Sequence, residues 1–194
     1  MNKTPFCHRS KTVSRLSDLE LRMTYRSDRH NIIEEFYVPC LMLSSVYSRA
    51  VGFFSSTSLS VAAKGLYVFL RGGGHMQLVA SPLLSLEDVE AIRRGYANRR
   101  VVEEQAITRA LDGEFAKLVE RRLELLAWLI QYDRLDIKVA VLHDTNYPGV
   151  YHEKIGIFSD GHDFVAFSGS PNESCSGLVG NFECIDVYCS WRPE

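Results

Sequence analysis

Apolar residues recur along the chain with two different periods, and their alternation predicts a fold of both helices and strands. In 31–43 and in 59–70 they recur every three or four residues, which is typical of a helix with one buried face. The runs 49–54 and 76–80 are short and mostly apolar, as strands are. Because a strand, a helix and a second strand follow one another, we expect the two strands to be parallel neighbours joined by a right-handed crossover.

The second half of the chain continues the same alternation. Ser85, followed three positions later by Asp88, predicts the start of a helix that reaches about Tyr96. A longer helical pattern covers 100–132, with Gly113 as a break. The remaining strands are expected at 136–142, 155–158, 164–167 and 184–190. We find no internal repeat, so each feature is present in one copy.

Composition argues against a membrane-spanning chain and against a disulfide scaffold. The 194 residues are 46% hydrophobic and 24% charged, which is ordinary for one globular domain with a sizeable core. No apolar run approaches the roughly 20 residues that cross a bilayer, and the first residues lack the apolar segment of a secretory signal. The five cysteines are odd in number and form no C-x-x-C pair. We therefore expect reduced thiols in a cytoplasmic protein, with no zinc site and no membrane partner.

Charge is distributed unevenly along the chain. Residues 1–30 hold seven Lys or Arg against three Asp or Glu, a net charge of +4, which leaves −6 for the remainder of a chain whose total is −2. This predicts two parts, a basic N-terminal arm (1–30) and a domain (31–194). The arm could touch a phosphate backbone or be a solvated tail, and the sequence leaves both open.

The chemistry of the chain is concentrated in one stretch. His152 and Lys154 stand two residues apart, so on a strand their side chains point to the same face. A turn rich in Asp and Gly at 159–163 predicts a hairpin, whose return strand leads into Ser170 and Asn172. Either pair alone is an ordinary strand or turn feature. Joined by a hairpin, the two pairs bring together an imidazole, an ammonium, a hydroxyl and a carboxamide, all of which can bind phosphate.

In this order and spacing the residues resemble the HKD motif of the phospholipase D superfamily, commonly HxK(x4)D(x6)GSxN. The matching residues are His152, Lys154, Gly169, Ser170 and Asn172. The motif aspartate is out of register, because Ser159 stands at its position and Asp160 follows, and the hairpin turn is longer. That aspartate supports structure rather than chemistry, so the departure weakens the match only slightly.

Earlier segments extend the resemblance over most of the chain. They look like the front of phospholipase-D-like domains at the N-terminus of bacterial helicase-type restriction and defence proteins. These segments are 36–39, 47–56 and 62–65. The resemblance implies an α/β fold with a mixed, mostly parallel central sheet flanked by helices on both faces. It also implies a nucleic-acid substrate, DNA in the first place, and a helicase or other defence subunit as a partner.

The resemblance further implies roles for five side chains in a metal-free and cofactor-free cleavage of a phosphodiester. His152 would be the nucleophile and form a phosphohistidine. Lys154 and Asn172 would bind the non-bridging oxygens, with Ser170 supporting them. Glu183, eleven residues after Asn172, would hold the other nitrogen of the imidazole. A solvated carboxylate at a strand edge is the alternative interpretation of Glu183.

A single motif lacks the second histidine that protonates the leaving group in this superfamily. We therefore expect a two-fold homodimer in which a second molecule supplies it. The first hypothesis is a DNA endonuclease of restriction or phage defence. Two alternatives remain open at this point: a phospholipid phosphodiesterase, and a non-catalytic module that binds nucleic acid or dimerises within a helicase-like system.

Overall fold

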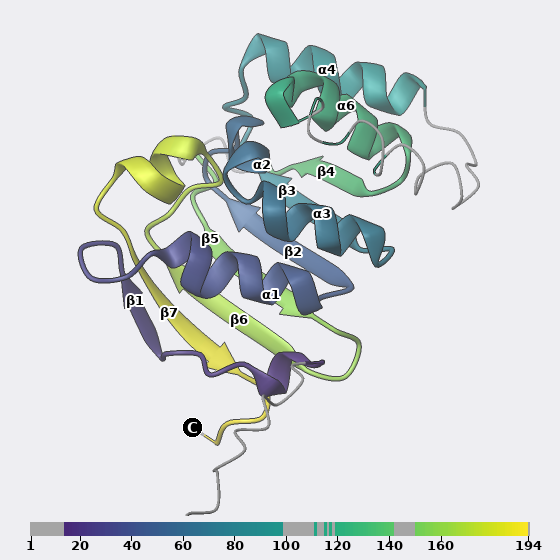
Figure 1. Cartoon of the computed structure of the whole chain (residues 1–194). Helices are drawn as coiled ribbons and strands as arrows, with labels where there is room; N and C mark the ends of the chain where they lie inside the picture. The colour runs from purple at the N-terminus through teal and green to yellow at the C-terminus, as the bar shows by residue number, and fades with distance from the viewer. Residues whose placement is uncertain are drawn as a thin grey trace, which may run out of the picture.

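The computed structural model describes residues 14–98, 111, 115, 117, 119–141 and 150–193. At its centre is a seven-stranded sheet in the order β1-β7-β6-β5-β2-β3-β4 (Figure 1). The strands are β1 (Thr24–Arg26), β2 (Val46–Val51), β3 (His75–Ala80), β4 (Leu135–Val139), β5 (Lys154–Ser159), β6 (Phe164–Gly169) and β7 (Cys184–Cys189).

Helical segments connect these strands, most of them where the apolar periodicity predicts helices, whereas two short ones at 16–18 and 176–180 were not predicted. They are η1 (Leu16–Asp18), η2 (Ile33–Tyr37), α1 (Val38–Leu43), α2 (Thr57–Val61), α3 (Ala63–Arg71), α4 (Leu86–Ala97), α6 (Arg122–Gln131) and η3 (Ser176–Gly180). The expected start of α4 is confirmed, because Ser85 Oγ accepts a hydrogen bond from Asp88 N at 3.0 Å. In η2 and α1 the winding changes from π to α one residue before Pro39, which has no N–H to donate to the preceding turn.

The sheet is mixed, and the expectation that it is mostly parallel is wrong. β2 pairs with β3, and β3 with β4, in parallel, as the strand–helix–strand pattern predicts. The other four pairings are antiparallel: β2 with β5, β5 with β6, β6 with β7, and β7 with β1. The reason is the hairpin of β5 and β6, which pairs with β2 and is extended by β7 without a crossover helix.

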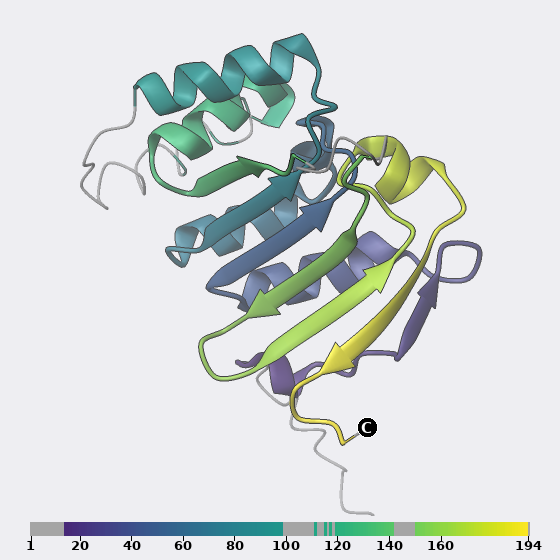
Figure 2. The same cartoon turned by 180° about the vertical axis from the view of Figure 1, so that it is seen from behind.

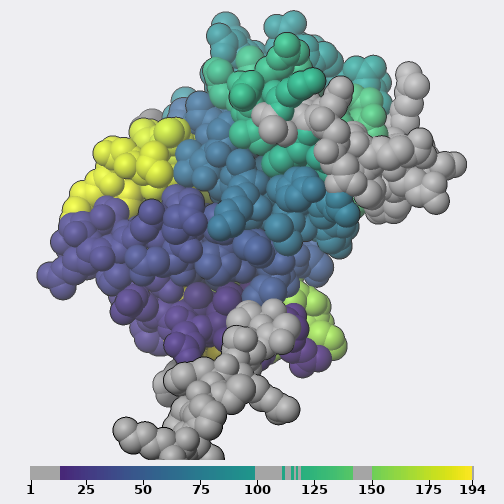
Figure 3. Space-filling model, in the orientation of Figure 1, coloured from purple at the N-terminus to yellow at the C-terminus, as the bar shows by residue number. Residues whose placement is uncertain are grey.

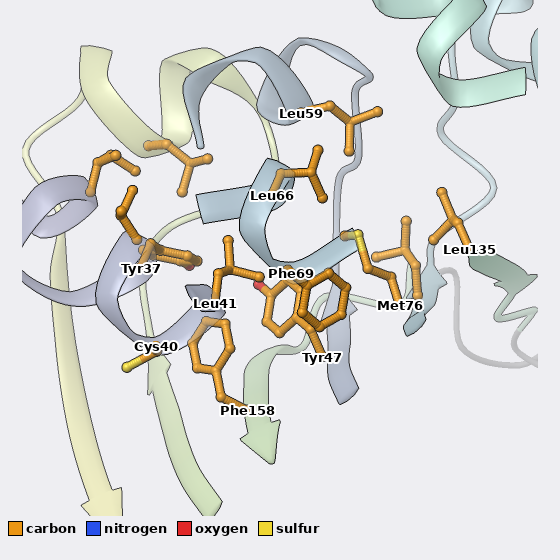
Figure 4. Close-up of a cluster of buried hydrophobic side chains, with 14 of the residues drawn as sticks. Tyr37, Cys40, Leu41, Tyr47, Leu59, Leu66, Phe69, Met76, Leu135 and Phe158 are labelled. Carbon is orange, nitrogen blue, oxygen red and sulfur yellow. The ribbon is translucent and has the colours of Figure 1, made fainter. Parts of the chain in front are cut away.

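One face of the sheet carries the main core beneath η2, α1 and α3 (Figures 1 and 4). Tyr47 of β2 stacks on Phe158 of β5 with ring centroids 4.5 Å apart. Phe36 of η2 meets Phe158 and Phe167 edge to face, at 5.8 and 5.2 Å. Each fully buried aromatic side chain contributes about 1.5–3 kcal/mol relative to exposure. The packing therefore fixes the hairpin of β5 and β6 against β2, which is the arrangement the site needs.

The opposite face of β5, β6 and β7 is open within the described residues (Figure 2). Ile155 and Ile157 of β5, Phe164 of β6 and Tyr188 of β7 are exposed there. The helices α4 and α6 pack on each other beside β4, and Tyr96 of α4 bonds the backbone N and O of Ile137 at the sheet edge. The expectation of helices over both faces is thus not met on this half of the sheet.

Several expected elements differ in extent. β4 ends at Val139, three residues before the predicted end of that strand. The predicted break at Gly113 and most of the loop 143–150 lie outside the described residues, as do residues 1–13 of the basic arm. From residue 14 onward the basic segment is part of the domain, because Leu16 and Tyr25 are buried and β1 pairs with β7. Among the described helices none is long and apolar enough to cross a bilayer.

Candidate active site

The predicted residues lie at one end of the strands of the sheet, next to α2 and η3 (Figures 1 and 2). Five strands contribute to this end. β2, β3 and β6 end at this edge, and β5 and β7 begin there, because the two groups run in opposite directions. The register places Lys154 opposite Val51 of β2 and Gly169 opposite Ile185 of β7. His152, Ser170, Asn172 and Glu183 are therefore carried on chain segments that leave or enter the sheet at the same edge.

His152 and Lys154 lie in contact, but they do not share a strand as predicted, because β5 begins at Lys154 and His152 precedes it. Lys154 Nζ is 3.1 Å from Nδ1 and 3.0 Å from Nε2 of the imidazole, and His152 is exposed. An ammonium that donates to an imidazole nitrogen needs that nitrogen unprotonated, which is the form able to attack an electrophile. The pair therefore places a cation beside the candidate nucleophile.

The backbone directly after β2 approaches His152 at Gly52, a glycine that the sequence reasoning did not single out. A Cβ added to Gly52 would lie 2.5 Å from His152 Cδ2 and 3.0 Å from its Cα. Ser81 Oγ, at the end of β3, donates to Gly52 O at 2.5 Å and fixes this backbone. Only glycine permits so close an approach of the two segments. The segment 47–56 contains Gly52, so its position after an apolar strand was the available signal.

Lys154 sits in an electrostatic field with two opposing neighbours. Partial burial lowers the pKa of Lys154, and the charge of Arg49 lowers it further, while Glu183 and Glu153 act in the opposite direction. The ammonium of Lys154 is thus near both a buried guanidinium and a buried carboxylate. An incoming phosphate anion would relieve the repulsion between the two cations.

Ser170 and Glu183 form the second contact pair of the site. Ser170 Oγ donates a short hydrogen bond to Glu183 Oε2 and accepts one from Cys184 N at 3.0 Å. Ser27 Oγ accepts from Glu183 N at 2.8 Å, and Ser27 N donates to Glu183 O at 2.9 Å. Glu183 is only 6% exposed, which excludes the interpretation as a solvated carboxylate.

The expected contact between Glu183 and His152 is absent from the hydrogen bonds of the described residues. The carboxylate bonds Ser170, and both imidazole nitrogens face Lys154. The resemblance implied that Glu183 bonds His152, whereas in the structure Glu183 bonds Ser170. Glu183 therefore orients the hydroxyl of Ser170 in this arrangement.

Asn172 lies half-buried on the loop after β6 and has unused hydrogen-bonding capacity. Its Oδ1 is buried and has no partner within the described residues, while its backbone O accepts from Ser174 N at 2.9 Å. Gly177 of η3 packs closely, since a Cβ there would lie 2.6 Å from Asn172 O. A buried polar atom without a partner is costly, and a ligand that completes it recovers that cost.

Arg49 and Glu173 hold this loop in place, and the sequence reasoning missed both. Arg49 Nε donates to Glu173 Oε2 at 2.9 Å, and Nη2 donates to Pro171 O at 2.7 Å. Tyr47 Oη also donates to Glu173 Oε2, at 3.3 Å. Arg49 is 3% exposed and Glu173 7%. The ion pair therefore clamps the residues on either side of Asn172.

The electrostatics of Arg49 follow from its burial among acceptors. Burial would lower the pKa of the guanidinium, but Tyr37, Tyr47 and Glu173 raise it above its usual value. The guanidinium also lies 4.9 Å from the ring of Phe167, and its Nη1 is buried without a hydrogen-bond partner among the described residues. Beneath the site lies a buried guanidinium whose charge is paired with the carboxylate of Glu173.

Asp160, the aspartate out of register with the motif, lies at the far end of β5. Its carboxylate accepts hydrogen bonds from His162 N at 2.9 Å, Asp163 N at 2.7 Å and Leu16 N at 3.0 Å. β5 has six residues, so Asp160 and the site are separated by roughly 20 Å of strand. Asp160 thus stabilises the hairpin turn and takes no part in the site.

Comparison with known proteins finds similarity at the level of structure. No family model and no curated protein matches the sequence. NucT from Helicobacter pylori aligns over 84% of this chain and 82% of its own, with a TM-score of 0.50 at 14% identity. The two chains thus share a fold.

Two further structures align less closely. Nuc from Salmonella typhimurium, a phospholipase D family member, aligns over 77% of this chain and 70% of its own at 12% identity and a TM-score of 0.40. Yeast tyrosyl-DNA phosphodiesterase aligns over 74% of this chain but 24% of its own, with the same identity and TM-score. Within the described part of this chain, no three His, Cys, Asp or Glu side chains are grouped to hold a metal ion.

Proposed function

We propose that this chain is a phosphodiesterase of the phospholipase D type that cleaves nucleic acid, with His152 as the nucleophile. The observation that supports this most strongly is the meeting of His152 with Lys154, and of Ser170 with Glu183, at one sheet edge. Asn172, half-buried on the loop after β6, also supports the proposal, because the Nδ2–H₂ group of its carboxamide can donate to a phosphate oxygen. The similarity to NucT agrees with this class of fold.

The proposed reaction has two displacements at phosphorus. In the first, a nitrogen of His152 forms a bond to phosphorus while the bond to the leaving oxygen breaks, and that oxygen takes a proton from an acid. In the second, water attacks phosphorus, the P–N bond breaks, and the same acid, now a base, receives the proton of the water. Lys154 and the carboxamide of Asn172 bind the non-bridging oxygens throughout. Ser170, held by Glu183, is the supporting donor.

The general acid in this scheme is His152 of a second molecule. One chain carries a single motif, so one copy supplies the nucleophile and the other the acid. The proposal therefore includes a two-fold homodimer with a composite site. Light scattering tests it directly: the expected mass is twice 22.0 kDa, and a strict monomer under conditions of activity contradicts the shared site.

DNA is the proposed substrate, and restriction or phage defence is the proposed setting. The support is the resemblance of 36–39, 47–56 and 62–65 to the front of phospholipase-D-like domains in helicase-type defence proteins. A helicase or other defence subunit is accordingly the proposed partner. A module that binds nucleic acid without cutting it, and a phospholipid phosphodiesterase, are separate outcomes of the experiment below.

The test is cleavage in EDTA. Plasmid, single-stranded DNA and phosphatidylcholine vesicles are incubated with the chain, with His152→Ala and with His162→Ala, a matched control in the exposed turn at the other end of β5. We expect cleavage of DNA by the parent and the control, a loss of at least about 1,000-fold in His152→Ala, and intact lipid. A covalent adduct with labelled DNA should form in the parent and not in His152→Ala. Lipid turnover, or DNA cleavage that survives His152→Ala, overturns the proposal.

A further inference from the structure

A groove lies beside the candidate active site, between the loop that joins β1 to η2 and the helix η3. Its volume is about 510 Å³, which is within the range of ligand sites. The residues used below are Ser27, Arg29, His30, Asn31, Leu178 and Val179. In Figure 3 the surface of η3, in yellow, lies directly against that of the N-terminal part of the chain. Two segments far apart in the sequence thus form its two walls.

The two walls differ in chemistry. The N-terminal wall presents the guanidinium of Arg29, the imidazole of His30 and the amide of Asn31, whereas η3 presents the apolar side chains of Leu178 and Val179. None of the described residues that line the groove is acidic. One cationic and polar wall facing one apolar wall suits a ligand that has an anionic edge and an apolar body.

The cationic wall has hydrogen-bond donors to spare. Arg29 and Arg26 share one carboxylate, that of Asp28, at 3.7 and 3.6 Å, so their two positive charges exceed its negative charge by one. The side chain of Arg29 is 73% exposed. His30 Nδ1 accepts from Arg26 N at 3.1 Å, which in the neutral ring places the proton on Nε2. Arg29 and His30 are therefore both placed to donate to a phosphate.

An exposed aromatic ring stands beside the groove. Phe182 is 60% exposed, and the guanidinium of Arg26 lies over its ring at 5.0 Å from the centroid. Ser27 of the groove wall fixes the chain on both sides of this ring, since its Oγ donates to Asn181 O and accepts from Glu183 N. Ser27 thus connects the groove to Glu183, whose carboxylate bonds Ser170.

We propose that this groove binds single-stranded nucleic acid next to the scissile phosphate. Arg29 and His30 bind a backbone phosphate, and a base stacks on the face of Phe182 opposite the guanidinium of Arg26. Stacking on an exposed ring needs a base whose face is free, so an unpaired strand fits and a duplex does not. Calling this strand a substrate depends on the proposed function, whereas the binding itself does not.

The experiment measures binding without cleavage. His152→Ala protein is titrated into a labelled single-stranded oligonucleotide of mixed sequence in EDTA, and fluorescence anisotropy gives Kd at several salt concentrations. Phe182→Ala should weaken binding roughly 5- to 100-fold. Arg29→Gln should weaken it and reduce the slope of log K against log salt by about one unit. Arg93→Gln, which removes an exposed arginine of α4, is the matched charge control and should change Kd less than about twofold.

A second oligonucleotide separates the two contacts. With an abasic strand, Phe182→Ala should have no effect, while Arg29→Gln should weaken binding as before. Phe182→Leu, which keeps an apolar side chain and loses the ring, should behave as Phe182→Ala. Unchanged Kd in both Arg29→Gln and Phe182→Ala overturns the proposal, and so does a duplex that binds as tightly as the single strand.

Cleavage by chains with His152 intact distinguishes the failure of this inference from the failure of the proposed function. If both stand, Phe182→Ala and Arg29→Gln raise KM and leave kcat near that of the parent. If no variant or parent cuts DNA but the groove variants still lose binding, the groove stands and the phosphodiesterase does not. If His152→Ala abolishes cleavage while the groove variants bind and cut as the parent does, the groove is wrong and the function stands.

Discussion

The two ends of the hairpin formed by β5 and β6 differ in how completely their polar groups are paired. At the turn, the carboxylate of Asp160 accepts three backbone N–H groups, and Asp163 accepts from Ser190 Oγ at 3.1 Å. At the other end, Asn172 Oδ1 and Arg49 Nη1 are buried without partners among the described residues. The polar groups at the turn end of the hairpin are thus paired, whereas two of those at the site end are not.

Because of this difference, the turn end of the hairpin stabilises the fold, whereas the other end has polar groups available to bind a ligand. An unpaired buried polar atom costs about 1–3 kcal/mol, so two of them weaken the folded state on the side where Lys154 and Ser170 lie. The clamp of Arg49 on Glu173 and the packing of Phe158 and Phe167 offset this cost. The same strand pair therefore carries a conventional turn at one end and a site with unused donors and acceptors at the other.

Of the substitutions that test this comparison, Arg49→Met should have the largest effect, a loss of stability. The substitution leaves Glu173 buried without a counter-charge, which costs about 3–5 kcal/mol in the free energy of unfolding. Urea unfolding followed by circular dichroism measures it. Arg121→Met, which breaks an exposed pair with Glu124, should cost at most about 1 kcal/mol. A loss below about 1 kcal/mol for Arg49→Met would mean that the ion pair does not hold the loop.

The next largest effect should come from Lys154→Met, which removes a phosphate ligand and leaves the clamp intact. We expect cleavage to fall about 100- to 1,000-fold, with Lys64→Met, an exposed lysine on α3, as the control. Unlike the loss at Arg49, this loss should come without destabilisation, as measured by thermal unfolding. An inactive Lys154→Met protein that is also clearly less stable would contradict the separation.

The difference in stability between the parent and Lys154→Met should depend on pH with a defined sign. Partial burial and Arg49 lower the pKa of Lys154, so the unfolded chain binds this proton more tightly than the folded one. The stability of the parent rises as pH rises through the lowered pKa. Lys154→Met should therefore be at least as stable as the parent at neutral pH, and the gap should close at alkaline pH.

The sequence predicts local parts of the site better than distant ones. His152 and Lys154 stand only two residues apart, so they meet even though β5 begins at Lys154 and His152 precedes it. Ser170 follows from the hairpin. Arg49 and Glu173 are 124 positions apart, and their pairing depends on β2 lying beside β5. The alternation of Tyr47, Arg49 and Val51 did place the arginine on the inner face, where a buried charge needs a partner, so part of that signal was present.

Prediction of the fold from the sequence has the same limit: local arrangements are predicted better than distant ones. The strand–helix–strand pattern predicts the parallel half of the sheet correctly, since a helix between two strands determines their direction. A hairpin determines only the direction of its own two strands, and the pairing of β5 with β2 and of β7 with β1 depends on contacts across the whole chain. The link from Glu183 to Ser170 likewise depends on the register of β6 against β7.

A smaller effect, confined to the site end, should follow from Gly52→Ala. The new Cβ would lie 2.5 Å from His152 Cδ2, so the exposed imidazole or the backbone must shift by a fraction of an ångström or more. Such a displacement of a nucleophile can cost up to about 100-fold in rate. Gly72→Ala, whose Cβ meets nothing closer than 3.5 Å, is the control. Cleavage by Gly52→Ala at the rate of the parent would show that His152 does not need its observed position.

The smallest effect should come from the other end of the hairpin, in Asp160→Asn. Burial raises the pKa of Asp160, but the N–H groups of Asp163, Leu16 and His162 more than offset this and hold it below its usual value. The ionised form thus stabilises the folded state above the ordinary carboxyl pKa of about 4, and this contribution is lost as pH falls through the lowered value. An asparagine keeps one acceptor oxygen for His162 N and Asp163 N but turns an N–H₂ toward Leu16 N.

Asp160→Asn should therefore cost about 1–2 kcal/mol at pH 7, with a difference that shrinks below about pH 4 and with cleavage unchanged at temperatures where both proteins are folded. Urea unfolding at a series of pH values, paired with cleavage assays, measures both quantities. Because the turn and the site are separated by the full length of β5, loss of cleavage in a folded Asp160→Asn protein would mean that the two ends of the hairpin are coupled. The contrast between a paired end and an unpaired end would then describe one cooperative unit rather than two regions with separate roles.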